Sequence, residues 1–496
     1  MTSSSCRKSI SLFLQIVFII FLSSLFSLVL LKDIYFSSVN LEQILFHLYA
    51  PLKGSPTDLS KFLPHFLALF LCSTGSLFFL KYKKPKIFTA TCLILAALNV
   101  ILLEITFGVS EYISNQFQLS EFIEQNYVNP KKIQITFPKR KKNLIFILAE
   151  SLETTFQDIK NGGSFQKNYI PELTALAHSH LNFSHTNKQE GAEVFSNSGW
   201  TIAGMVAQLA GIPLKTYGNS FNDGGNEMSS VVSFLPGVWA LGDILNQNGY
   251  RNVFIAGSDT TFAGKNLFMS QHGNYEIYDK PKMEEEFKRK FEIVHDRIIA
   301  DSELLPIAQK KISALAQEKE PFHVLLLTGD THMLGYLGND CPKSIYEEKK
   351  QIEKSYKCAD YRLKEFVDWI MKQPFYEDTT IVIVGDHCNM LSFDAILNGE
   401  EREEYVLYSG NNRKVYNAFI NTDTPVFQSH NRKFSTLDMY PTILASIGAK
   451  IEGDRLGLGT NLFSNKRTLL EKYSYDFIEQ EFKKKSLFYM KHLWGK

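Results

Sequence analysis

The fold is decided by a short apolar run, Asn143-Leu144-Ile145-Phe146-Ile147-Leu148-Ala149, which leads directly into Glu150-Ser151-Leu152-Glu153. A continuous apolar run of this length predicts a strand buried on both faces of a parallel sheet. Similar runs recur at residues 253–256, 324–328 and 380–384, and helical stretches such as residues 345–371 separate them. Alternating strands and helices predict an α/β domain with a mostly parallel sheet flanked by helices.

Acidic and histidine residues follow several of these predicted strands. Glu150 follows the first strand, Asp330-Thr331-His332 the third and Asp386-His387 the last. Ligands in such sheets gather beyond the carboxyl ends of the strands, so we expect these side chains to share one edge. A single carboxylate at a strand end often only caps the next helix, but their convergence favours a functional site.

A second stretch, Ser196-Asn197-Ser198-Gly199-Trp200-Thr201, runs directly into apolar residues at helical spacing: Ile202, Met205, Val206 and Leu209. This pattern predicts a helix that begins at Thr201 and ends at Gly211-Ile212-Pro213. The start of a helix favours an anion, so a phosphate group could lie against the Thr201 hydroxyl. The alternative is that Thr201 only caps the helix.

Carboxylate oxygens, a hydroxyl and one imidazole together suit a divalent ion such as Zn, Mn or Mg. We therefore expect Glu150, Asp386, His387 and Thr201 to hold one divalent metal ion. The metal would lower the pKa of the Thr201 hydroxyl and make it a nucleophile at neutral pH.

Several motifs occur in an order that matches a known family. The segment from Gly199 to Met205 and the later Gly211-Ile212-Pro213-Leu214 resemble the nucleophile segment of membrane-anchored phosphoglycerol and phosphoethanolamine transferases of the bacterial envelope. These enzymes belong to the sulfatase-like branch of the alkaline phosphatase superfamily, and the phosphoglycerol transferases of osmoregulated periplasmic glucans are the most similar. The remaining motifs are Gly257-Ser258-Asp259, Phe262-Ala263-Gly264-Lys265, His272-Gly273, Asp330-Thr331-His332, Asp386-His387, Leu437-Asp438-Met439-Tyr440-Pro441-Thr442 and Arg455-Leu456-Gly457-Leu458-Gly459.

The resemblance implies a sulfatase-like fold and a mechanism in two steps. Thr201 would take a phospho-alcohol from a phospholipid and pass it to an acceptor hydroxyl. His332 would donate or accept the proton, and Lys265 would contact the phosphate. Trp200 and Asp259 are further candidates for substrate contacts. For His332 the alternative is a histidine satisfied by backbone groups, and for Asp259 it is a cap of its own loop.

The function that this resemblance favours is the transfer of phosphoglycerol from phosphatidylglycerol to a glycan or glycolipid of the envelope. The alternatives are a phosphoethanolamine transferase acting on lipopolysaccharide or lipid A, and a non-catalytic envelope sensor or binding module. A sulfatase would need Cys or Ser in a C/S-x-P-x-R context, which is not found around Thr201. The net charge of +1 gives no general attraction to nucleic acid.

The first hundred residues predict a membrane anchor. Apolar runs at residues 10–31, 62–80 and 87–107 are each long enough for a bilayer core, which takes about 20 residues. Arg7, Lys8 and the lysines at 81, 83, 84 and 86 place the N-terminus and the second loop in the cytoplasm, by the positive-inside rule. We therefore expect a multi-pass protein of the bacterial cytoplasmic membrane, with its catalytic domain on the periplasmic or extracellular side.

The expected parts are an anchor (1–109), a linker helix and stalk (110–142), the catalytic domain (143–465) and a basic aromatic C-terminal helix (466–496). That last helix either lies on the membrane or closes the domain. The apolar residues Leu41, Ile44, Leu45 and Leu48 predict a short helix, lying at the interface or packed on the spans. Outside the membrane, Cys341 and Cys358 are the best disulfide pair, with free buried thiols as the alternative.

Overall fold

The computed structural model describes residues 2–35, 41–49, 59–215, 233–294, 297–332, 335–338, 340–390 and 413–495. The chain divides into two compact units, one made of residues 1–41 and 56–116 and the other of residues 42–55 and 117–496. Each unit is described by itself.

The first unit contains the predicted membrane anchor. Its long helices are α1 (Thr2–Tyr35), α3 (Leu59–Lys83) and α4 (Pro85–Phe107), followed by the short α5 (Val109–Phe117). The segments Phe13–Leu30, Leu63–Lys83 and Ile87–Phe107 are long and apolar enough to cross a membrane. The three predicted spans are therefore present as helices, and most of their side chains face outward, as expected for lipid contact.

The second unit is built on a six-stranded sheet with the order β4-β3-β7-β2-β8-β9. Every neighbouring pair is parallel except β8 and β9, which are antiparallel. The predicted strands are all present with slightly different ends. The six strands are β2 (Asn143–Ala149), β3 (Arg251–Ala256), β4 (Glu276–Asp279), β7 (Phe322–Leu327), β8 (Thr379–Gly385) and β9 (Asn417–Ile420).

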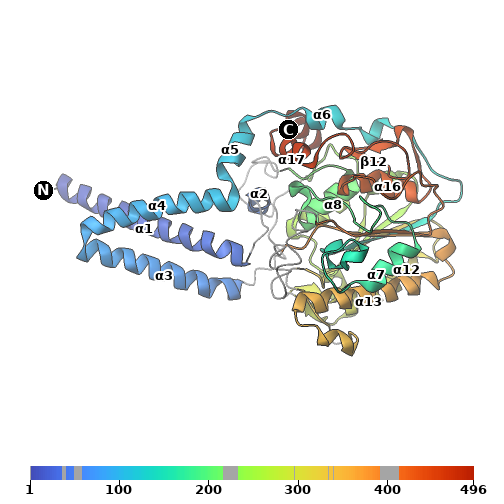
Figure 1. The fold of residues 1–496 in the computed structure, drawn as a ribbon, viewed down its shortest axis with the longest axis horizontal. Coiled ribbons are helices and arrows are strands. Elements are labelled where there is room, and N and C mark those ends of the chain that lie inside the picture. The colour runs from blue at the N-terminus through green and yellow to red at the C-terminus, as the bar shows by residue number, and fades with distance from the viewer. Residues whose placement is uncertain are drawn as a thin grey trace. The chain divides into compact units, whose positions relative to one another are not determined.

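Helices cover both faces of this sheet, as Figure 1 shows. Leu144, Phe146 and Leu148 of β2 pack into one apolar core, and Ile145 and Ile147 pack into another on the opposite face. The helices of the first core are α8 (Thr201–Ala210), α9 (Leu241–Gln247), α10 (Lys265–Gln271), α16 (Met439–Ser446) and α17 (Tyr475–Lys483). Those of the second are α7 (Pro171–Ser179), α12 (Asp301–Leu315) and α13 (Gln351–Met371), with α11 (Lys280–Phe287) beside β4.

Short paired strands complete the unit. They are β1 (Ile135–Thr136) with β10 (Lys450–Ile451), β5 (Ile293–Val294) with β6 (Ile298–Ile299), and β11 (Arg455–Leu456) with β12 (Gly459–Thr460). The helix predicted over residues 345–371 is divided, because a 3-10 helix at Lys343–Glu347 precedes α13.

Three connecting regions bear on the expected parts. The predicted stalk belongs to the second unit from Phe117 on, where α6 (Phe122–Asn126) buries Ile123 and β1 pairs with β10. The C-terminal segment closes the domain, because Tyr489 and Trp494 are buried in the first core. The helix predicted around Leu41 forms as α2 (Leu41–Tyr49), but it packs on the second unit, where Phe46 is fully buried. The alternative that this helix packs on the spans is therefore wrong, and its place at the membrane interface stays a prediction.

Candidate functional site

The adjacency of β2 and β8 brings together residues that are far apart in the sequence. Ala149, the last residue of β2, is in register with Gly385, the last residue of β8. Glu150 follows the first strand and Asp386-His387 the second, so the three side chains meet at the carboxyl edge of the sheet. The register between β2 and β8 aligns the ends of the two strands, and so it places Glu150 next to Asp386 and His387.

Helix α8 delivers Thr201 to the same edge. The helix begins at Thr201 and ends at Ala210, where Gly211 adopts a left-handed conformation with φ of 66°. Trp200 occupies the N-cap position without a side-chain hydrogen bond, so the Thr201 hydroxyl does not act as the cap. Thr201 Oγ1 lies 3.4 Å from Glu150 Oε2 and 3.3 Å from His387 Nε2.

Two contacts hold α8 against the end of β8. At Gly204 a Cβ atom would lie 2.2 Å from the carbonyl oxygen of Asp386, so only glycine permits this close approach. One turn later, the Gln208 amide donates hydrogen bonds to the carbonyl oxygens of Gly385 (2.9 Å) and Asp386 (3.2 Å). The position of Thr201 is therefore coupled to the backbone that carries Asp386.

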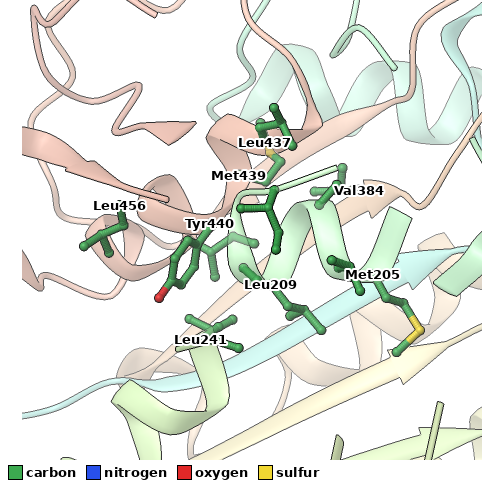
Figure 2. Close-up of a cluster of buried hydrophobic side chains, with 14 of the residues drawn as sticks. Met205, Leu209, Leu241, Val384, Leu437, Met439, Tyr440 and Leu456 are labelled. Carbon is green, nitrogen blue, oxygen red and sulfur yellow. The ribbon is translucent and has the colours of Figure 1, made fainter. Parts of the chain in front are cut away.

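The rest of α8 is buried between the sheet and α16 (Figure 2). Met205 and Leu209 pack with Val384 of β8 and with Met439 of α16, and all four are almost inaccessible to solvent. Burying an apolar side chain of this size contributes about 1.5–3 kcal/mol. The helix that carries Thr201 is thus anchored by its apolar face.

Glu150, Asp386 and His387 form a group that could hold a metal ion. One ligand atom from each residue lies within 4.8 Å of the others, and all three residues are buried. The group fits a divalent cation because Asp386 Oδ2 is buried without a hydrogen-bond partner among the described residues. His387 Nε2 lies 3.4 Å from this oxygen without a hydrogen bond to it, and a buried carboxylate oxygen without a hydrogen bond is costly, so a cation at this point would satisfy it.

Neighbouring groups orient these three side chains. Asp386 Oδ1 accepts hydrogen bonds from the backbone N–H groups of Ser151 (2.7 Å) and His387 (2.8 Å), which leaves Oδ2 for the site. Nδ1 of His387 contacts the carbonyl oxygen of Cys388 at 2.7 Å. A ring nitrogen next to a carbonyl carries the proton, so Nε2 is left as a possible ligand atom.

The charges in the group shift one another's pKa values. Burial acts to raise the pKa of Glu150, but the charges of His387 and His332 outweigh it and lower that pKa to about 2. Burial and the charge of Glu150 raise the pKa of Asp386 to about 7. Burial acts to lower the pKa of His387, whereas Asp386 and Glu150 raise it to about 9. The acids and the imidazole are therefore strongly coupled, which is typical of functional sites.

Two residues next to Glu150 have roles that the sequence did not suggest. Ser151 adopts a left-handed conformation with φ of 53°, and its N–H donates to Asp386. Glu153, which also lies in the polar segment after β2, turns away from the group. It pairs with Arg413 and accepts a hydrogen bond from the N–H of Asn389 at 3.1 Å. Glu153 thus holds the loop after His387.

His332 follows β7, the neighbour of β2 on its other side. Its charge acts to lower the pKa of Glu150. Asp330 holds this loop, because it forms a buried ion pair with Arg362 of α13. Arg362 also pairs with Asp340, which precedes the disulfide between Cys341 and Cys358. The Cα atoms of these two cysteines are 5.6 Å apart.

The other predicted substrate contacts lie on the β3 side of the site. Lys265 is buried, and its ammonium donates to the carbonyl oxygen of Phe262 at 3.0 Å. Burial and the nearby Arg297 lower the pKa of Lys265 to about 8. Asp259 accepts hydrogen bonds from the N–H and hydroxyl of Thr261, so it caps its own loop. Trp200 is buried in the core and offers little surface to a substrate, with 3% of it exposed.

Comparison with known proteins places these features in a family. The family model described as Sulfatase matches residues 142–449. A curated relative, phosphoglycerol transferase I of Salmonella choleraesuis, is 33% identical over 344 residues, which are 68% of this chain and 41% of the relative. The protein of the same name from Salmonella typhimurium has the same identity and coverage. The chain thus spans about two fifths of the length of these relatives.

Similar solved structures have low sequence identity. An alkaline phosphatase superfamily protein from Vibrio parahaemolyticus has a TM-score of 0.47 at 19% identity, covering 68% of this chain and 74% of that protein. The lipoteichoic acid synthase LtaP from Listeria monocytogenes has a TM-score of 0.48 at 16% identity, covering 70% and 82%. The family match spans more than half of the residues and contains β2, β8 and α8, and the chain therefore belongs to the sulfatase family.

Proposed function

We propose that the chain transfers a phospho-alcohol head group from a membrane phospholipid to a glycan of the cell envelope, with Thr201 as the nucleophile. One observation carries the proposal: the Thr201 hydroxyl borders the buried group of Glu150, Asp386 and His387. The similarity to phosphoglycerol transferase I supports phosphoglycerol, from phosphatidylglycerol, as the group transferred. A threonine nucleophile supports phosphoryl transfer over sulfate-ester hydrolysis.

The reaction has two steps that return the site to its starting state. Thr201, its hydroxyl proton released to solvent, attacks phosphorus while the bond from phosphorus to the diacylglycerol oxygen breaks. His332 gives a proton to that oxygen, and the phospho-alcohol remains on Thr201 as an ester. An acceptor hydroxyl then loses its proton to His332 and attacks phosphorus, which breaks the ester and frees Thr201, whose oxygen takes a proton back from solvent.

The residues around Thr201 fit these steps. A divalent cation held by Glu150, Asp386, His387 and Thr201 would favour the ionised hydroxyl and offset negative charge on the phosphoryl group. The buried Lys265 provides a positive charge on the other side of the site.

We also infer that the domain faces the periplasm or exterior of a bacterial cytoplasmic membrane. The lysines at 81, 83, 84 and 86 support this orientation, because they favour the cytoplasm. The packing of α2 supports the number of spans, because three spans place the first connection and the catalytic domain on one side. This helix lies between the first two candidate spans in the sequence and packs within the second unit, so it shares a side of the membrane with the catalytic domain.

The test is to detect the ester on Thr201. Full-length protein is incubated with divalent metal and vesicles of phosphatidylglycerol or phosphatidylethanolamine, and the peptide that contains Thr201 is analysed by mass spectrometry. We expect a phosphoglycerol adduct from the first lipid and no adduct in Thr201→Ala. An adduct from phosphatidylethanolamine alone would identify that lipid as the donor instead. No adduct from either lipid would overturn the proposal and favour a binding or sensor module.

A further inference from the structure

Helix α2 contacts the domain beside the nucleophile. Phe46 is fully buried, and its ring centroid lies 5.9 Å from that of Trp200 and 6.3 Å from that of Phe234. Trp200 directly precedes Thr201. A segment that connects two candidate membrane spans therefore packs one residue away from the proposed catalytic threonine.

The next residue of α2 reaches the other side of the site. The His47 ring stacks on Phe262, with ring centroids 5.3 Å apart and an interplanar angle of 6°. The same phenyl ring lies 4.8 Å from the Lys265 ammonium and 5.7 Å from the guanidinium carbon of Arg297. Three nitrogen-bearing side chains from three segments thus gather around Phe262, and we call them the Phe262 cluster.

Two members of the cluster, Lys265 and His47, have polar atoms that the described residues do not fully satisfy. Lys265 is buried and its ammonium donates to the carbonyl oxygen of Phe262, while the charges of Glu150, Asp259 and Asp279 act on its pKa without forming an ion pair with it in the described ranges. His47 Nδ1 is also buried without a hydrogen-bond partner there. Burial, and then the charge of Lys265, lower the pKa of His47 to about 4, so its ring is neutral near pH 7 and can donate or accept one hydrogen bond. A buried ammonium and an unpaired ring nitrogen together suit a ligand that carries both an anion and hydroxyl groups.

The cluster is also electrostatically linked to the proposed catalytic group. The negative charge of Glu150 acts to raise the pKa of Lys265, against burial and the charge of Arg297. Phe46 and His47 are consecutive. Phe46 contacts Trp200, which precedes Thr201, and His47 contacts Phe262, whose carbonyl oxygen accepts a hydrogen bond from Lys265. Helix α2 therefore borders the space between the nucleophile and the cluster.

We propose that α2 forms one wall of the head-group pocket, in which His47 Nδ1 hydrogen-bonds the phospho-alcohol of a phospholipid whose phosphate lies against Lys265 and Arg297. The inference rests on the proposed function for the identity of the lipid. It makes the connection between the first two spans part of the substrate site, so the anchor has a role in recognition. His47 then discriminates among head groups, whereas Lys265 and Arg297 bind the charge that all of them share.

Two replacements separate ligand binding from ring packing. His47→Phe keeps a ring on Phe262 but removes the nitrogen, while His47→Asn keeps a polar atom close to the position of Nδ1 but removes the ring. The control is His180→Ala, at the end of α7 on the opposite face of the sheet. All variants are made in the full-length Thr201→Ala protein, which binds lipid without turnover.

Binding is measured by calorimetry with short-chain phosphatidylglycerol and, separately, inorganic phosphate. We expect His47→Phe to weaken lipid binding about tenfold, the effect of losing one hydrogen bond to a polar ligand. His47→Asn should retain most of the affinity, and His180→Ala all of it. Full affinity in His47→Phe would overturn the proposal, and so would inorganic phosphate that binds as tightly as the lipid.

The outcome is independent of the transfer reaction. If no ester forms on Thr201 but His47→Phe loses lipid affinity, the result supports the head-group pocket and refutes the proposed function. If wild-type protein and His47→Phe transfer phosphoglycerol with the same KM, the result supports the proposed function and refutes the role of His47.

Discussion

Gly204→Ala tests whether the close packing of α8 on the end of β8 sets the position of Thr201. The new Cβ would lie 2.2 Å from the carbonyl oxygen of Asp386, whereas such contacts are essentially never under 3.0 Å. The difference means that the helix or the Asp386 backbone must move by at least about 0.8 Å. Since a displacement of about 1 Å in a catalytic group can cost 100-fold in rate, we expect turnover to fall by about two orders of magnitude.

The same change should have a much smaller effect on stability. Overpacking costs about 1–3 kcal/mol, and alanine recovers about 1 kcal/mol over glycine within a helix. The free energy of unfolding should thus fall by no more than about 2 kcal/mol, so the variant remains folded. Gly199→Ala is the matched control, because its Cβ would meet the carbonyl oxygens of Ser196 at 3.4 Å and Phe195 at 3.9 Å, which are ordinary contacts.

The assay compares both variants with wild type by phosphoglycerol transfer, calorimetric titration with Mn²⁺ and thermal unfolding. Gly204→Ala should lose transfer and bind Mn²⁺ more weakly, while Gly199→Ala stays close to wild type. If Gly204→Ala keeps wild-type transfer and metal affinity, then the spacing between α8 and β8 does not position Thr201, and the coupling inferred from Gly204 and Gln208 is wrong.

Three further predictions concern the metal, the pH dependence and the disulfide. Glu150→Gln should lose bound divalent metal, measured by elemental analysis after dialysis, while Glu172→Gln on the opposite face keeps it; full metal content in Glu150→Gln would place the metal elsewhere. Burial lowers the pKa of Lys265 to about 8, so its charge is present below that pH and turnover should fall as the pH rises through it. Lys265→Arg stays charged, so its turnover should no longer decrease in this pH range, whereas an unchanged pH profile would mean that another group causes the decrease. Cys341→Ser should lower the free energy of unfolding by about 3 kcal/mol in urea, because the bond to Cys358 closes a loop; equal stability would contradict this.

Local patterns were sufficient for the four central strands of the sheet and for helix α8, whereas the edge strands β4 and β9 were not predicted. The apolar run at 143–149 forms β2 with the predicted bounds, because a strand covered on both faces needs apolar residues at every position. The spacing after Thr201 specified α8 down to its glycine stop, since a helix face repeats over three or four residues. These signals depend on neighbours in the chain and are therefore visible in a single sequence.

Contacts across the fold were only partly visible. The sequence already grouped Glu150 with Asp386, His387 and Thr201, but only the structure showed that Glu153, three residues on, pairs with Arg413. No local pattern predicts that pair, because Arg413 is distant in the sequence.

The sequence by itself determined the candidate spans, the parallel α/β sheet and the residues at the carboxyl ends of its strands, because hydrophobic periodicity and strand-end chemistry are local properties. The tertiary structure alone decided that Phe46 and His47, from the connection between two spans, lie against Trp200 and Phe262. The reason is physical: an amphipathic helix carries an apolar face that must be buried, but its sequence does not state whether lipid, another helix or a distant domain buries it.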